Sequence, residues 1–206
     1  MLAKTHIVAG AAAAALAAAW RHDPLTPAVL VLGGLGGLAP DLDHPQALLT
    51  RHVPLAPLAA GAAQHLGVVR HRGILHSFAL AAVAAIWVEP ALGRLVAHVL
   101  WALGVGFGHA PWVEALWRLW GGGGAVGFAA GYVSHLLVDV LNTTGVQWLW
   151  PLRWWAHLPW PSIPVGTWPE TVLRWGILAG LGAWHPLTAL WVAVAAEGIY
   201  RGVKGA

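Results

Sequence analysis

Side chains able to bind a metal or move a proton are gathered in three short blocks of this sequence. The four aspartates are at positions 23, 41, 43 and 139, and the last three lie near a histidine inside segments that are otherwise hydrophobic. The three blocks are Pro40–His44, His71–Ser77 and Ser134–Asp139. Carboxylates and imidazoles this close together are typical ligands of a divalent cation, which offsets the repulsion between neighbouring carboxylates.

The first block, Pro40-Asp41-Leu42-Asp43-His44, closes an apolar run and is followed by Pro45. The two prolines predict an extended turn, and alternation along such a turn places Asp41 and Asp43 on the same side. We therefore expect Asp41, Asp43 and His44 to be metal ligands. The alternative is a loop of solvated charges at the end of a helix.

The second block, His71-Arg72-Gly73-Ile74-Leu75-His76-Ser77, opens another apolar run. A helix that begins near Gly73 would place His76 in its first turn and His71 on the approaching loop. The exposed amides of that turn, together with Arg72, favour an anion such as phosphate. The alternative is a basic segment that anchors the chain at a membrane interface.

The third block places His135 and Asp139 four residues apart. On a helix this spacing brings both onto one face about 6 Å apart, so they can share a cation. A plain hydrogen bond between them is the alternative.

His6, at the start of the first apolar run, is expected to join the site. Because cysteine is absent, the ligands are nitrogen and oxygen only, which suits Zn, Mn, Fe or Mg.

The composition indicates which elements must position these blocks. Hydrophobic residues make up 58% of the 206 residues and charged residues 9%, whereas about a quarter of a typical soluble domain is charged. The absence of cysteine also excludes a disulfide scaffold and a thiol nucleophile. Eleven basic residues against eight acidic ones form no basic stripe, so a nucleic-acid partner is not expected. The chain is expected to be an integral membrane protein.

Six apolar runs are candidates for membrane segments: Ile7–Trp20, Leu25–Leu38, Ile74–Val88, Leu95–Phe107, Ala125–Leu141 and Val172–Ala196. From them we predict an all-α fold, a polytopic membrane helix bundle with four to six hydrophobic segments, in one integral membrane domain over residues 1–206. If every run spanned the bilayer, Asp139 would emerge opposite Asp41 and His76. One run, Leu25–Leu38 or Leu95–Phe107, is therefore expected to be re-entrant or flat.

Small and aromatic residues refine this picture. Glycines at 33–34, 36–37, 176 and 180 are expected to let helix backbones approach closely. The segment Gln147–Glu170 is rich in tryptophan and proline and is expected to lie along the membrane surface. The first twenty residues also fit a secretory signal peptide, but His6 favours their retention in the fold.

At these three blocks the sequence resembles the YdjM-type family of predicted membrane-bound metal-dependent hydrolases. The resemblance rests on a Pro-Asp-x-Asp-His block, a His-Arg-Gly-x-x-His-Ser block and a Ser-His-x-x-x-Asp helix, in that order. It extends to Thr5-His6 and to Trp150-Pro151-Leu152, and so covers nearly the whole chain. Leu75 stands where threonine is expected, which puts in doubt a hydroxyl beside the site but no ligand. The His-x-x-x-Asp helix is also similar to the metal-binding helix of zinc-dependent phospholipase C, which favours phosphoester substrates.

These observations predict an enzyme, a metal-dependent hydrolase of the bacterial inner membrane that acts on a phosphoester of a lipid or lipid-linked substrate. No protein partner is predicted. The expected metal ligands are His6, Asp41, Asp43, His44, His71, His76, His135 and Asp139. Asp43 or Asp139 would accept a proton from water, and Arg72 would stabilise phosphate charge.

Two other functions stay open at this point. A metal-ion or proton-coupled transporter would line its pathway with such histidines and aspartates, and a non-catalytic scaffold would use a closed structural metal site. The clusters lie at the ends of the apolar runs rather than at their middles, which favours the hydrolase.

Overall fold

The computed structural model of the chain describes residues 2–52, 56–65, 73–83, 123–152, 154–157 and 162–205. Its elements are, in chain order, α1 (Ala3–Trp20), α2 (Pro27–Gly36), the 3₁₀ turns η1 (Ala39–Asp43) and η2 (Thr50–His52), α3 (Ala56–His65), the 3₁₀ turn η3 (Ile74–His76), α6 (Gly124–Val140), α7 (Trp168–Trp184) and α8 (Pro186–Gly205). Within these residues the only β pairing is an isolated bridge between Val146 and Ala156. The predicted all-α class is confirmed.

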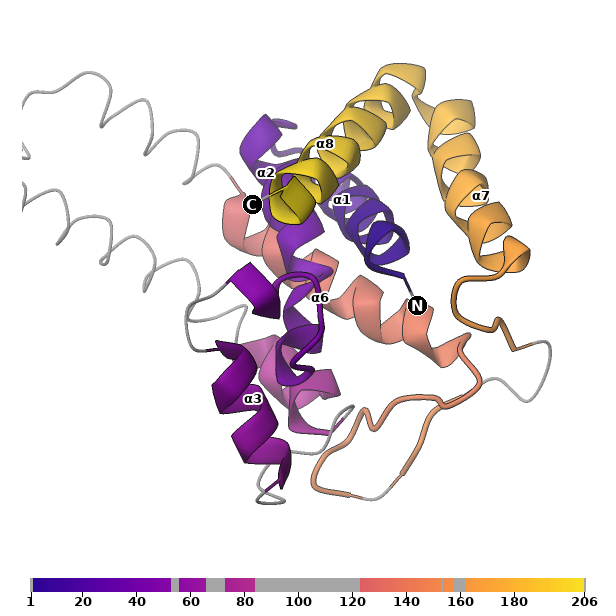
Figure 1. Cartoon of the computed structure of the whole chain (residues 1–206). Helices are drawn as coiled ribbons and strands as arrows, with labels where there is room; N and C mark the ends of the chain where they lie inside the picture. Colours follow the sequence, from indigo (N-terminus) through magenta and orange to yellow (C-terminus); the bar gives the residue numbers. More distant parts are fainter. Residues whose placement is uncertain are drawn as a thin grey trace, which may run out of the picture.

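Helix α1 is the centre of the bundle and contacts α2, α6, α7 and α8 (Figure 1). Its residues from Thr5 to Ala12 are all buried. A helix that is apolar on every side is typical of a helix enclosed by others rather than one with a solvent face. The small alanine side chains also allow the neighbouring helices to lie close to its axis.

Glycines bring α1, α2 and α6 into close backbone contact. A Cβ added to Gly33 in α2 would lie 2.7 Å from the carbonyl oxygen of Gly10 in α1. A Cβ added to Gly131 in α6 would lie 2.0 Å from the carbonyl oxygen of Gly33. Such distances leave no room for a side chain, so the expected role of the glycines at 33–34 and 36–37 is confirmed for α2.

The apolar run Val172–Ala196 falls on two helices, which meet at the His185-Pro186 break within the run. Helix α7 ends at Trp184, and α8 begins at Pro186. His185 between them is extended, with φ −156° and ψ 102°, because a proline disfavours helical geometry in the residue before it. The two helices pack against each other as a hairpin (Figure 1).

The expectation that Gly176 and Gly180 mediate close helix packing is wrong. No atom of the described residues lies within 4 Å of a Cβ added at either position. Helix α7 instead packs on the rest of the bundle through Ile177, Leu178 and Leu181. These three side chains lie on the opposite side of the helix, so the two glycines face outward.

The remaining apolar runs are only partly described. The run Ala125–Leu141 corresponds to α6, and Leu25–Leu38 contains α2, whose ten residues extend about 15 Å, half the thickness of a bilayer core. The run Leu95–Phe107 lies outside the described residues, as does the end of Ile74–Val88. None of the described helices is both long enough and apolar enough to cross a membrane.

Candidate metal centre

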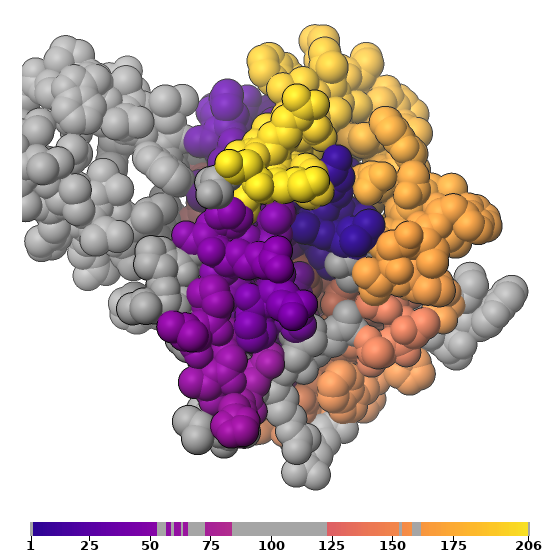
Figure 2. Space-filling view, in the orientation of Figure 1, coloured from indigo at the N-terminus to yellow at the C-terminus, as the bar shows by residue number. Residues whose placement is uncertain are grey.

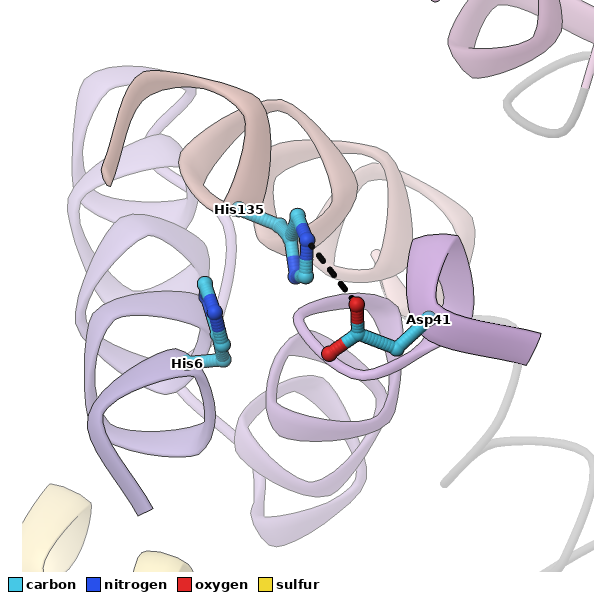
Figure 3. A group of neighbouring side chains, drawn as sticks. All are labelled: His6, Asp41 and His135. Atoms are coloured by element: carbon cyan, nitrogen blue, oxygen red, sulfur yellow. Dashed lines mark ion pairs between the residues drawn. The ribbon is translucent and has the colours of Figure 1, made fainter. Parts of the chain in front are cut away.

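Four chain segments meet at one end of the bundle and bring five ionisable side chains together. His6 comes from the first turns of α1, Asp41 from η1 just after α2, and His76 from η3. His135 and Asp139 come from the last turns of α6. Figure 3 shows His6, Asp41 and His135 pointing toward one another from three different elements.

The donor atoms of these five residues form a compact group. Asp41 Oδ1 lies 3.6 Å from His76 Nε2 and 3.7 Å from His135 Nε2. Asp139 Oδ1 lies 3.3 Å from His6 Nε2, and its Oδ2 lies 3.8 Å from His135 Nε2. Two sets, His6–Asp41–His135 and His76–His135–Asp139, have ligand atoms all within 4.8 Å of one another. The prediction that the three blocks and His6 converge is confirmed for these residues.

Neighbouring groups orient two of the imidazoles. His135 Nδ1 lies 2.7 Å from the carbonyl oxygen of Gly37, and since a carbonyl only accepts, Nδ1 carries the proton. His76 Nδ1 lies 3.6 Å from Asp43 Oδ2. Both rings therefore turn Nε2 toward the centre. Carbonyls and carboxylates hold metal-binding histidines in this way.

Burial makes this group costly unless a cation is present. The side chains of His6, His76 and His135 are fully buried and that of Asp139 is 1% exposed, whereas Asp41 is 23% exposed. Burial alone would raise the pKa of Asp41, but the nearby His135 and His76 imidazoles hold it well below its ordinary value. Buried carboxylates require a compensating positive charge, which a divalent metal supplies.

His6 provides the clearest indication that a ligand belongs here. Both of its ring nitrogens are buried and form no hydrogen bond among the described residues, although Nε2 lies 3.3 Å from Asp139. Its ring stacks on that of His135, with centroids 3.8 Å apart and planes inclined by 17°. Buried polar atoms rarely lack partners. The nitrogen and oxygen donors present fit a divalent cation.

The first predicted block adopts a different local structure from the one expected. Residues Ala39–Asp43 form a 3₁₀ turn rather than an extended turn, because Leu38 continues the helical geometry of α2 and the fixed φ of Pro40 suits the first turn of a helix. Asp41 and Asp43 consequently lie on two sides of the His76 ring, one at each nitrogen.

The second block also differs. His76 lies in η3, and the following Ser77 is extended. The Ser77 hydroxyl accepts from Leu80 N at 3.3 Å, so a helical stretch begins after His76 and not near Gly73. His71 and Arg72 lie outside the described residues, and with them the anion site expected there.

None of the other histidines that the structure describes belongs to the two three-residue groups. His44 is half-buried, and its Nδ1 accepts from Gln46 N at 3.3 Å. Exposed histidines are found at positions 22, 52, 65 and 157. The predicted ligand His44 is thus next to Asp41 in sequence but is absent from both three-residue groups.

Sequence reasoning missed one buried carboxylate. The spacing of Glu170 and Arg174, four residues apart at the start of a helix, predicts an ion pair between them. Glu170 instead accepts the N–H groups of Leu2 and Gly166. Burial would raise its pKa, but these N–H groups and the Thr5 hydroxyl lower it. Glu170 joins the loop before α7 to the start of α1, close to His6. The sequence does not reveal these partners of Glu170, because backbone N–H groups are present at almost every residue and form no recognisable motif.

A cavity of about 500 Å³ opens beside the centre. Asp41 and His44 line it together with Lys4, Arg51 and Tyr200. Figure 2 shows this face, with the N-terminal residues in indigo between the purple segment around η1 and η2 and the yellow helix α8. The group of candidate metal ligands is thus connected to the outside at Asp41.

The comparisons with known proteins agree with the motifs. The sequence profile of the family described as YdjM inner membrane protein matches residues 1–205. The inner membrane proteins YdjM of Escherichia coli (strain K12) and of Shigella flexneri are each 30% identical over 124 residues, which cover 59% of this chain and 48% of theirs. The chain thus aligns with about half the length of these curated relatives. No solved structure matches.

Proposed function

Because the chain belongs to the YdjM inner membrane protein family, we propose that it is a membrane-bound metal-dependent hydrolase acting on a phosphoester of a lipid or lipid-linked molecule. The predicted location in a bacterial inner membrane is confirmed by the family and its relatives. The observation that carries the proposal is the convergence of three buried imidazoles and two carboxylates beside an open cavity.

The donor set supports a catalytic centre rather than a closed structural one. Structural zinc sites have four protein ligands in a closed shell. Here the candidate ligands are His6, Asp41, His76, His135 and Asp139, and Asp41 borders the cavity. A cation bound by them supplies Lewis-acid polarisation of a phosphoryl oxygen and lowers the pKa of a water.

The residues themselves divide the remaining work. Asp139 contacts His6 Nε2 and His135 Nε2 through separate oxygens, so it can hold both rings and exchange a proton with His6. Asp43 contacts His76 Nδ1 and orients that ring. Of the carboxylates predicted to act as base, Asp139 therefore lies nearer the group of donor atoms.

A metal-ion or proton-coupled transporter is the alternative. A pathway would place ionisable groups along the length of several helices. In the described residues, the ionisable groups of α1, η1 and α6 that face the interior gather at one end of the bundle. This arrangement favours a reaction site at a membrane surface.

The test is hydrolysis by the detergent-purified full chain. We expect metal-dependent release of product from at least one lipid in a panel of phosphomonoester and phosphodiester lipids, loss of activity with a chelator, and recovery with added Zn, Mn, Fe or Mg. If metal-loaded protein cleaves no member of the panel, the hydrolase proposal is wrong. Uptake of the same metals into proteoliposomes then tests the transporter.

A further inference from the structure

We propose that the cavity beside Asp41 binds the phosphate group of an amphiphilic substrate, with Lys4 and Arg51 as its cationic contacts. This inference rests on the proposed function, and it adds a binding site and a substrate class. Neither Lys4 nor Arg51 belongs to the motifs of the metal centre, and both line the cavity.

Access to the centre supports this assignment. The side chains of His6, His76 and His135 are fully buried and that of Asp139 nearly so. Asp41 is the candidate ligand with an exposed surface, and it is a wall of the cavity. Within the described chain, a substrate therefore reaches the donor atoms past Asp41.

The charges around the cavity favour an anion. Among the described residues, its lining contains the cations Lys4 and Arg51 and the single carboxylate Asp41. The carboxylate faces His76 and His135, so its charge is directed into the centre. A phosphate bound between the cations and the centre would be neutralised from both sides.

The ion pair of Lys4 does not remove it from this role. Lys4 Nζ lies 3.6 Å from Glu197 Oε2, but Glu197 also accepts from Arg201 Nε at 2.7 Å. One carboxylate is thus shared by two cations. The side chains of Lys4 and Glu197 are 39% and 46% exposed, and pairs this exposed are weak. Lys4 can therefore exchange Glu197 for a phosphate oxygen.

Most of the remaining wall is apolar, although His44, Gln46 and Tyr200 also line it, and this apolar surface favours an amphiphile over a free anion. Leu2, Leu38, Leu48, Leu49 and Val165 line it. A volume of about 500 Å³ is in the usual range of pockets for small ligands. It accommodates a headgroup and the first carbons of its chains. The shared chemistry is a phosphate group, and the apolar wall favours a lipid as its source.

Binding of non-hydrolysable probes tests the proposal without relying on turnover. Calorimetry on the metal-loaded full chain in detergent compares a short-chain phosphonolipid, the uncharged diacylglycerol of equal chain length, and inorganic phosphate. We expect the phosphonolipid to bind tightest. Arg51→Gln and Lys4→Gln should each weaken it about tenfold, as the loss of a charge-assisted contact does.

Three controls separate charge from folding and from metal loss. Arg51→Lys keeps the charge and should retain most of the affinity. Arg21→Gln removes a cation just beyond the C-terminal end of α1 that does not line the cavity, and this variant should bind as the unaltered protein does. Metal content should be equal in all variants. Unchanged affinity in both Gln variants, or equal affinity for the uncharged lipid, overturns the proposal.

The outcomes also separate this site from the proposed reaction. If the protein binds the phosphonolipid through Lys4 and Arg51 but hydrolyses no phosphoester, the site stands and the hydrolase proposal fails. If it hydrolyses a phosphoester with unchanged KM in both Gln variants, the hydrolase stands and the site fails. Inorganic phosphate bound as tightly as the phosphonolipid contradicts the lipid source.

Discussion

The interior formed by α1, α2 and α6 and the hairpin of α7 and α8 use the same apolar and glycine-rich composition in opposite ways. In the interior, Gly33 and Gly131 bring backbones into direct contact, and His135 is fully buried. On the hairpin, Gly176 and Gly180 have no described atom within 4 Å of an added Cβ, and Trp175 and Trp191 are 62% and 54% exposed. The interior is therefore in contact with other helices, whereas the outer face of the hairpin is exposed.

This difference separates packing from membrane contact. Close backbone approach through small residues is how helices associate when hydrophobic burial gives little driving force, and it holds the candidate metal ligands in place. Large exposed apolar surfaces mark contacts with a membrane or another protein. On α8, the exposed residues Leu187, Leu190, Trp191 and Val194 follow the spacing of a single helix face.

The largest expected effect is the loss of activity when the buried carboxylate of Asp139 is replaced. Asp139→Asn keeps the shape of the side chain but removes the charge that contacts His6 and His135. We expect a folded, membrane-inserted protein whose hydrolysis of a phosphoester lipid falls by about 10² to 10⁴. Activity assays and circular dichroism check this.

Asp23→Asn is the matched control for that substitution. Asp23 pairs with Arg21 at 2.7 Å on the surface beyond α1, so the Asp23→Asn variant should have the activity of the unaltered protein. If Asp139→Asn has full activity, α6 does not contribute Asp139 to the reaction site, and this part of the proposal is wrong.

Metal affinity should fall when a ligand is removed. Asp41→Ala, His76→Ala and His135→Ala should each lower the affinity for a divalent metal about tenfold or more, because each removes a donor atom from the group. His52→Ala and His157→Ala, both exposed, should leave it unchanged. Metal analysis by mass spectrometry compares the five variants, and equal retention in all of them contradicts a shared site.

The sequence predicted which side chains gather at the centre better than it predicted the local geometry around them. The i, i+4 spacing of His135 and Asp139 and the early His6 were sufficient to expect convergence, because a helix fixes side-chain direction from spacing alone. The turn around Asp41 was misjudged, because proline is compatible with both extended and 3₁₀ geometry. The contact between His135 and the carbonyl oxygen of Gly37 could not be predicted, because every residue has a carbonyl group and no side-chain motif marks this one.

The hairpin shows the limit of composition as a guide to structure. Gly33 and Gly37, at the end of α2, have the same spacing as Gly176 and Gly180 in α7, and only the packing of neighbouring helices decides whether such a pair is buried. The break at His185 was visible in the sequence as the residue before Pro186. Glu170 could not be assigned, since its partners are backbone N–H groups distant in sequence.

Substituting one glycine in the interior and one in the hairpin should change the free energy of unfolding by an intermediate amount. Gly131→Ala places a Cβ 2.0 Å from the carbonyl oxygen of Gly33, and such overpacking costs about 1–3 kcal/mol. Gly180→Ala meets no atom within 4 Å and should stabilise α7 by up to about 1 kcal/mol through helix propensity. Thermal unfolding in detergent measures both, and equal effects would contradict the difference in packing.

The smallest perturbation locates the exposed face of α8. Because the chain has no cysteine, single cysteines can be labelled selectively, and surface changes of this kind usually alter stability by less than about 0.5 kcal/mol. We expect Leu190→Cys to react with a membrane-impermeant maleimide in detergent-solubilised protein but to be protected in intact bilayers. Arg201→Cys, at a position 78% exposed, should react in both, and Val192→Cys, at a fully buried position, in neither. If Leu190→Cys reacts equally in bilayers, lipid does not cover this face, and the exposed apolar residues of α8 must contact something other than the membrane.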